Sequence, residues 1–199
     1  MKELFPVHTA DTAPEGARPL LLQAEKNLGM VPNLERVMAT APTLLAGYVQ
    51  LWELFDETSL TPIERQVVYQ TANFENECNY CVPWHTHLSQ IAKMAPEDVQ
   101  ALRDGGALSD SKLEALRHFT QALIRTQGKI SQSDMDAFVA HGWSSQQALE
   151  VVLGLAVKTM SNYTNSIAGT PLDKAVEKFT WKKPTVAMRL ELLSPDAEQ

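Results

Sequence analysis

Two cysteines and a histidine are the residues whose types and spacing predict chemistry in this chain of 199 residues. Cys78 and Cys81 are its only cysteines, and His85 follows Cys81 by four positions. Two thiols at this spacing can close a disulfide across one turn. A thiolate at the start of a helix is also stabilised by the positive end of the helix dipole. The pattern therefore predicts thiol redox chemistry.

The spacing also predicts a mechanism. On a helix, Cys81 and His85 share a face, which places His85 to take a proton from Cys81 directly or through water. The thiolate would attack an electrophile such as a peroxide oxygen, and Cys78 would capture the resulting sulfenic acid as a disulfide. An external reductant must then restore the dithiol.

Two other interpretations of these residues stay open. In the first, the cysteines are small buried residues and His85 is a histidine without a function. In the second, the residues form a zinc site, and its ligands would be Cys78, Cys81, His85 and His87. Two histidines two positions apart point to different faces of a helix, and zinc fingers place a long gap between the cysteine and histidine pairs. We therefore expect no metal.

Composition narrows the class of protein. Seventeen basic residues against 24 acidic ones give a formal net charge of -7, which argues against binding nucleic acid or an anionic membrane. The first residues do not resemble a signal peptide. The most apolar window, residues 149–167, is interrupted by Lys158, Ser161 and Asn162, so we expect no membrane span. These features favour the cytoplasm, where structural disulfides are rare.

Apolar residues recur with helical periodicity almost throughout, and no strand pattern is present. We expect one all-α domain of about eight helices at residues 16–183, with an N-terminal arm at 1–15 and a polar tail at 184–199. The start signals lie near Pro19, Pro42, Pro62, Tyr80 to Val82, Pro96, Ser111, Ser131 and Ser144, and Thr170-Pro171 is expected to cap a last short helix.

Capping boxes mark three of these starts, namely Thr61 with Glu64, Ser111 with Glu114, and Ser144 with Gln147. We expect Glu64 to serve its own helix, although it is also a candidate member of a proton relay. Glu77 lies next to Cys78 and is a second candidate base; its alternative is a solvated residue at a helix end.

The chain resembles a known family. The resemblance rests on two segments, Leu60-Thr61-Pro62-x-Glu64-Arg65-x-Val67-Val68 and Asn76-x-Cys78-x-Tyr80-Cys81-x-x-x-His85-Thr86. This combination resembles the alkylhydroperoxidase D-like (carboxymuconolactone decarboxylase) family. Further segments resemble its peroxidase-related subgroup, so that the similarity covers about residues 25–180: Leu28-Gly29-x-Val31-Pro32-Asn33, Lys158-x-x-Ser161-Asn162-Tyr163-x-Asn165 and Gly169-Thr170-Pro171-Leu172.

The resemblance implies a helical domain that assembles as trimers or hexamers. It also implies that Cys81 is the peroxidatic cysteine, Cys78 the resolving one, and His85 part of the proton relay. Two positions depart from the well-studied peroxidases. Gln66 replaces the relay glutamate twelve residues before the first cysteine, and an amide cannot accept a proton as a base. Tyr80 replaces a second imidazole.

We therefore expect a thiol-dependent peroxidase or disulfide reductase without a bound cofactor. Its partners would be a hydroperoxide or other small molecule and an external dithiol, lipoyl or thioredoxin-like. One alternative is a lyase or decarboxylase acting on a lactone or keto acid, and another is a non-enzymatic redox sensor. Four polar residues lie close together on the long helix that starts near Ser144: Ser161, Asn162, Tyr163 and Asn165. We expect this polar patch to line a site, form an oligomer contact or bond to nearby backbone.

Overall fold

The computed structural model describes residues 4–185, which form nine α-helices and one 3-10 helix and contain no strand. This confirms the predicted all-α class. None of the described helices is long and apolar enough to cross a membrane. The predicted tail lies almost entirely outside the described residues. The elements are α1 (Arg18–Leu28), α2 (Asn33–Met38), α3 (Pro42–Asp56), α4 (Pro62–Glu75), α5 (Cys81–Ile91), α6 (Pro96–Asp104), α7 (Ser111–Arg125), α8 (Gln132–Ala140), α9 (Ser145–Ala168) and η1 (Lys174–Phe179).

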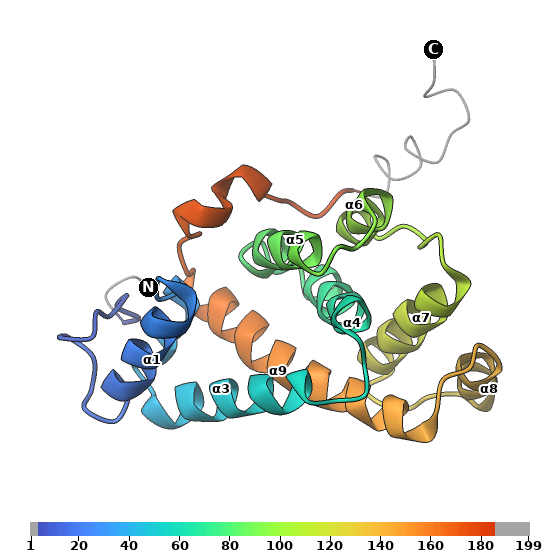
Figure 1. Cartoon of the computed structure of the whole chain (residues 1–199), viewed down its shortest axis with the longest axis horizontal. Coiled ribbons are helices and arrows are strands. Elements are labelled where there is room, and N and C mark those ends of the chain that lie inside the picture. The colour runs from blue at the N-terminus through green and yellow to red at the C-terminus, as the bar shows by residue number, and fades with distance from the viewer. Residues whose placement is uncertain (1–3, 186–199) are drawn as a thin grey trace, which may run out of the picture.

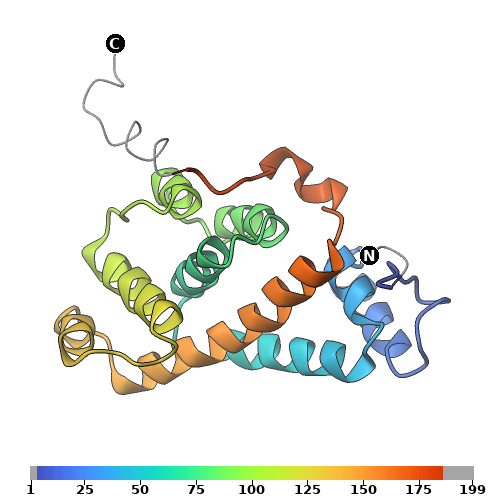
Figure 2. The same cartoon turned by 180° about the vertical axis from the view of Figure 1, so that it is seen from behind.

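Helix α4 is the centre of the arrangement (Figures 1 and 2). It packs against α5, α7 and α9, and nine consecutive residues from Gln66 to Phe74 are buried. The long helix α9 also packs along α3, while α7 and α8 lie at the end opposite α1. The two helices that flank the cysteines, α4 and α5, are therefore held between α9 on one side and α6 and η1 on the other.

The helix starts follow the predicted capping chemistry with one correction. Capping boxes form at Thr61 with Glu64 and at Ser144 with Gln147. The box predicted at Ser111 is wrong, because the Asp110 carboxylate caps α7 by accepting from the N–H groups of its first turn. An aspartate is as good an N-cap as a serine, and here it comes one residue earlier.

Helix α2 was not predicted, and the last short helix starts later than expected. The N–H groups at the start of α2 donate to distant partners, from Asn33 to the Asp173 carboxylate (3.1 Å) and from Leu34 to the Tyr80 hydroxyl (3.0 Å). Thr170-Pro171 does not cap η1, which begins at Lys174 without a side-chain cap. The residue before it, Asp173, is instead bonded across the molecule to α2 and α5.

Gly154 allows α9 to approach α3 and α4 closely. A Cβ at this position would lie 2.6 Å from a ring carbon of Phe55 and 3.0 Å from Val68, both of which are buried. A methyl group does not fit there unless the helices move apart. The crossing matters for the site, because the next turn of α9 carries Lys158.

We expect Gly154→Ala to lower the free energy of unfolding by about 1–3 kcal/mol, as overpacked cores do. Gly47→Ala in α3 is the matched control, since its Cβ would meet only Met160, at 3.5 Å. Better helix propensity should make that variant more stable by about 0.5–1 kcal/mol. Denaturation by urea measures the free energy of unfolding of both variants. Equal values for the two would contradict the close contact of Gly154 with Phe55 and Val68.

Candidate active site

The two thiols lie where the chain turns from α4 into α5. Glu77 adopts a left-handed conformation with φ 54°, and the Cys78 N–H then donates to the Asn73 carbonyl at 2.9 Å. Helix α5 begins at Cys81, as predicted, and the Cys81 N–H donates to the Cys78 sulfur at 3.2 Å. Both cysteines are buried and free. They therefore face each other across one turn at a helix N-terminus.

Two asparagines of α9 donate to the Cys81 sulfur. The distances are 3.1 Å from Asn162 Nδ2 and 3.2 Å from Asn165 Nδ2. Asn162 is itself fixed, because it also donates to Asn73 at 2.9 Å and accepts from Asn76 at 2.9 Å. Amide donors aimed at a sulfur favour its charged form.

Lys158, one turn before Asn162 and two turns before Asn165, completes a chain of polar contacts. Its Nζ donates to His85 Nε2 at 2.9 Å, and His85 Nδ1 donates to Gln66 Oε1, also at 2.9 Å. The amide oxygen can only accept, so the His85 proton lies on Nδ1 and the Nε2 lone pair faces Lys158. The Tyr69 ring lies 5.2 Å from Lys158 Nζ and 4.8 Å from the imidazole.

These contacts shift the pKa values of the two thiols in opposite directions. Burial opposes ionisation of Cys81, but the Cys78 thiol, Lys158 and the two asparagines together lower its pKa to about 6. The hydrogen bond to Cys81 and burial raise the pKa of Cys78. Burial, followed by the Lys158 charge, lowers the pKa of His85, which keeps the imidazole neutral. Cys81 is therefore the thiolate of the pair.

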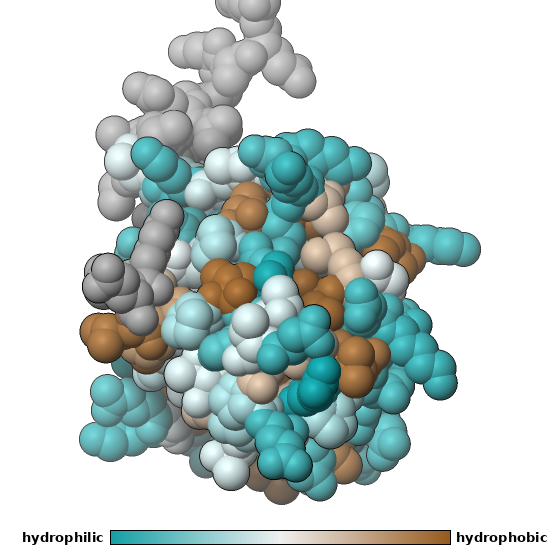
Figure 3. Space-filling view, turned by 90° about the vertical axis from the view of Figure 1, so that its left-hand side faces the viewer, coloured by the Kyte–Doolittle hydropathy of each residue, from teal (hydrophilic) through white to brown (hydrophobic). Residues whose placement is uncertain are grey.

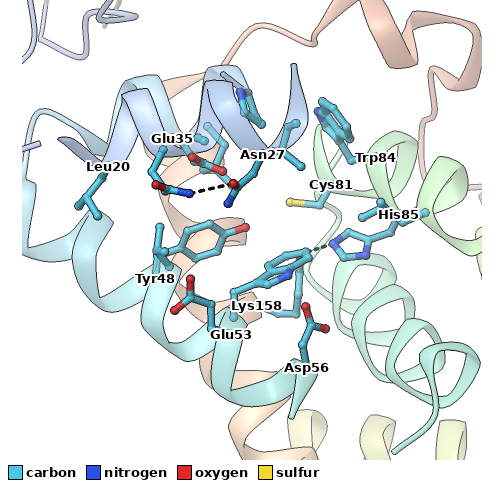
Figure 4. A pocket seen from close by; sticks show the side chains of 18 of the residues that line it. Leu20, Asn27, Glu35, Tyr48, Glu53, Asp56, Cys81, Trp84, His85 and Lys158 are labelled. Carbon is cyan, nitrogen blue, oxygen red and sulfur yellow. Dashed lines mark hydrogen bonds between the residues drawn. The ribbon is translucent and has the colours of Figure 1, made fainter. Parts of the chain in front are cut away.

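A cavity of about 360 Å³ leads to Cys81. Figure 4 shows the sulfur pointing into this space, with Trp84 and His85 on the same side and Tyr48 and Glu35 across from it. Its walls are mostly aromatic and aliphatic, and Cys78 is not among them. Helix α1 covers one side, at the end of the molecule seen in Figure 3, where small apolar patches lie among hydrophilic side chains. A substrate from solvent would therefore meet Cys81 first.

The structure brings some of the predicted residues together and leaves others apart. Gln66 joins the site through His85, but residues 4–185 show no direct hydrogen bond between His85 and the Cys81 sulfur. Tyr80 lines the cavity, yet its hydroxyl is bonded to Asp173 and Leu34. Glu64 caps α4, and Glu77 is exposed and paired with Lys183 at 3.3 Å.

The four candidate zinc ligands do not form a metal site in the described part of the chain. Within the described ranges, no group of three or more histidine, cysteine or acidic side chains could hold a metal ion. The His87 ring stacks on Phe179 with their centroids 6.1 Å apart.

Two residues with roles in this geometry, Lys158 and Glu35, were not among the predicted site residues. Lys158 had a usable signal: with Ser161, Asn162 and Asn165 it forms an i, i+3, i+4, i+7 stripe, so that the four polar residues share one buried face of α9. Tyr163, the other member of the predicted polar patch, points outward and is 60% exposed. Glu35 had no such signal, because it lies on the unpredicted α2.

The chain matches no protein-family model and no curated protein sequence. Solved structures do match it. An alkylhydroperoxidase D core, an uncharacterized peroxidase-related protein from Ralstonia eutropha JMP134, superimposes with a TM-score of 0.77 at 20% identity, over 86% of this chain and 93% of that one. This chain has the alkylhydroperoxidase D-like fold.

Two further structures place the fold in a wider chemical context. An uncharacterized peroxidase-related protein from Silicibacter sp. TM1040 matches with a TM-score of 0.74 at 18% identity, over 86% of this chain and 91% of that one. The debrominase Bmp8, solved as a variant in complex with 2,3,4-tribromopyrrole, matches with a TM-score of 0.70 at 17% identity, over 87% of this chain and 93% of that one.

We expect Lys158→Met to raise the pKa of Cys81 by about one unit or more, because the variant removes the cation that favours the thiolate. Titration of the thiolate absorbance in the ultraviolet should give a midpoint of about 6 for the wild type. Lys112→Met, whose lysine lies over Trp143 instead, should leave the midpoint where it is. An unshifted midpoint in Lys158→Met would contradict the assigned role of the ammonium.

Proposed function

We propose that the protein is a thiol-dependent peroxidase in which Cys81 attacks a hydroperoxide and Cys78 resolves the product. The observation that supports it most directly is the Cys81 sulfur, which faces a cavity, has a lowered pKa and lies one turn from a second free thiol. The shared fold with peroxidase-related proteins agrees with this chemistry but does not by itself assign it.

In the first step, the Cys81 thiolate attacks the terminal oxygen of the hydroperoxide. An S–O bond forms, the O–O bond breaks, and the leaving alkoxide takes up a proton. Cys81 is oxidised to a sulfenic acid by two electrons, and the peroxide is reduced to an alcohol. Lys158 and the two asparagines stabilise the thiolate before attack, beside a cavity whose walls are mostly apolar.

In the second step, the Cys78 sulfur attacks the Cys81 sulfur, water leaves, and a disulfide forms. The raised pKa of Cys78 keeps this thiol protonated until Cys81 has reacted. An external dithiol, lipoyl or thioredoxin-like, would reduce the disulfide by thiol exchange. This requirement fits the cytoplasm, where such reductants keep thiols reduced.

His85 and Gln66 position Lys158 in this proposal. The neutral imidazole accepts from the ammonium, and Gln66 fixes the ring from its other side. The Gln66 amide cannot serve as a base. The proton-carrying groups on the thiol side are therefore Lys158 and the thiols themselves.

We expect Cys81→Ser to lose consumption of hydroperoxide in the presence of a dithiol, because the variant lacks the nucleophile. Cys78→Ser should consume one equivalent per chain and then stop or slow, since the sulfenic acid has no internal partner. The measurements are peroxide consumption and intact mass. Full activity in Cys81→Ser would contradict the proposal. Formation of the disulfide in wild type without turnover would instead favour a redox sensor.

We also propose that the protein forms a homo-oligomer through the outer face of α9. This face exposes large apolar side chains near both ends of the helix, at 49–73% of their surface: Leu149, Val152, Tyr163 and Ile167. Their spacing keeps them on one stripe of the helix. A second copy of the same stripe could bury them by two-fold symmetry, and such pairs can build hexamers from trimers.

We expect wild type to elute as an oligomer with a mass, by light scattering, that is a multiple of 22.1 kDa. The double variant Leu149→Glu with Ile167→Glu should yield smaller particles, because charges are costly in an apolar contact. Leu22→Glu on α1, at a leucine that is 49% exposed, is the matched control and should assemble normally. A monomeric wild type would refute this interface.

A further inference from the structure

Glu35 is a carboxylic acid in the cavity that the thiol chemistry described above does not use. It lies on α2 and lines the cavity that leads to Cys81. Figure 4 shows it across the open space from the Cys81 sulfur, beside Tyr48. No group among residues 4–185 forms a hydrogen bond with its carboxyl. Its capacity for hydrogen bonding is therefore available to a bound molecule.

We propose that Glu35 is the general acid that delivers the proton to the leaving oxygen when Cys81 attacks its substrate. This inference rests on the proposed peroxidase function and adds a catalytic residue to it. The groups that stabilise the thiolate and the proposed acid lie on different walls of the cavity. Lys158 and the asparagines surround the sulfur from α9, whereas Glu35 reaches the cavity from the opposite wall.

The surroundings of Glu35 let a substantial fraction of this acid keep its proton near neutral pH. Burial and the charge of Asp173 raise the pKa of Glu35 to about 7. The helix that covers this part of the cavity, α1, contributes the uncharged side chains of Gln23 and Asn27. The titratable groups that line the cavity or act on Glu35 are Tyr48 and Glu53 on α3, Asp56 at the end of α3, Tyr80 and Cys81 at the start of α5, His85 on α5, Lys158 on α9, and Asp173 before η1.

The Cys81 thiolate forms the S–O bond, the O–O bond breaks, and the leaving alkoxide takes the proton from Glu35 to become an alcohol. The sulfur loses two electrons and the peroxide gains them. Glu35 is left as a carboxylate and regains a proton from solvent at the cavity mouth before the next turnover. A general acid of this kind typically accelerates a step by about 10²–10⁴-fold.

Oxidation of the reduced protein by a hydroperoxide, followed in a single turnover by stopped flow, tests the inference without any reductant. For tert-butyl hydroperoxide, the leaving group is a strongly basic alkoxide. Glu35→Gln keeps the size of the side chain but has no proton to give, so its rate constant should fall on the order of a hundredfold. Glu25→Gln, an exposed position on α1 outside the cavity, should match wild type.

Two readouts separate proton donation from a structural role. The wild-type rate constant should rise through pH about 6 as Cys81 ionises and fall through about 7 as Glu35 loses its proton. Glu35→Gln should keep the rise and lack the fall. Peracetic acid releases a weakly basic carboxylate that needs no proton, so wild type and Glu35→Gln should react with it at equal rates.

If the rate constant of Glu35→Gln falls with tert-butyl hydroperoxide but not with peracetic acid, Glu35 is supported as the acid. Equal losses with both oxidants, or wild-type rates and pH profile in Glu35→Gln, overturn this inference and leave the peroxidase function standing. A wild-type protein that reacts with neither oxidant overturns both.

Discussion

The site depends on a buried ammonium whose counter-charge is a thiolate. No carboxylate of residues 4–185 pairs with Lys158. Burial lowers the pKa of this lysine, and the neighbouring Cys81 thiolate offsets part of that effect. Removing a charge from water costs several kcal/mol unless a partner compensates. The thiolate therefore stabilises the ammonium as much as the ammonium stabilises the thiolate. Gln66 and the Asn162 network keep each partner in place, and Gly154 lets α9 approach closely enough for the pair to form.

This dependence gives a physical reason for an amide at position 66. A carboxylate bonded to His85 Nδ1 would favour a charged imidazole, and two adjacent cations would then compete for one sulfur. With Gln66, His85 stays neutral and only accepts from Lys158. Once Cys81 is oxidised, the ammonium loses its counter-charge and its pKa falls further. In the proposed second step, Lys158 can then give a proton to the sulfenic oxygen that leaves as water, and the resulting neutral amine takes up the proton that Cys78 loses as its sulfur attacks.

Local signals predicted the part of this site that is local in sequence. The helix start at Cys81, the capping boxes at Thr61 and Ser144, and the all-α class follow from spacing and propensity within a few residues. Lys158 lies 73 positions from His85, and neither residue reveals the other without the packing of α9 on α4. Helix α2 has six residues, too few for periodicity to be recognised, and partners far along the chain accept its first N–H groups.

The same distant partners connect the fold to the chemistry proposed for Glu35. The Asp173 carboxylate accepts from the Tyr80 hydroxyl, from Trp84 Nε1 at 2.9 Å and from the first N–H of α2, so that it joins α2, α5 and the start of η1. Its charge also contributes to raising the pKa of Glu35. A tyrosine at position 80 suits this arrangement better than an imidazole, because a phenol can donate to Asp173 while accepting from Leu34 without carrying a charge near neutrality. Tyr80, one of the two residues that depart from the peroxidase pattern, thus helps to hold α2, the helix that carries Glu35 into the cavity.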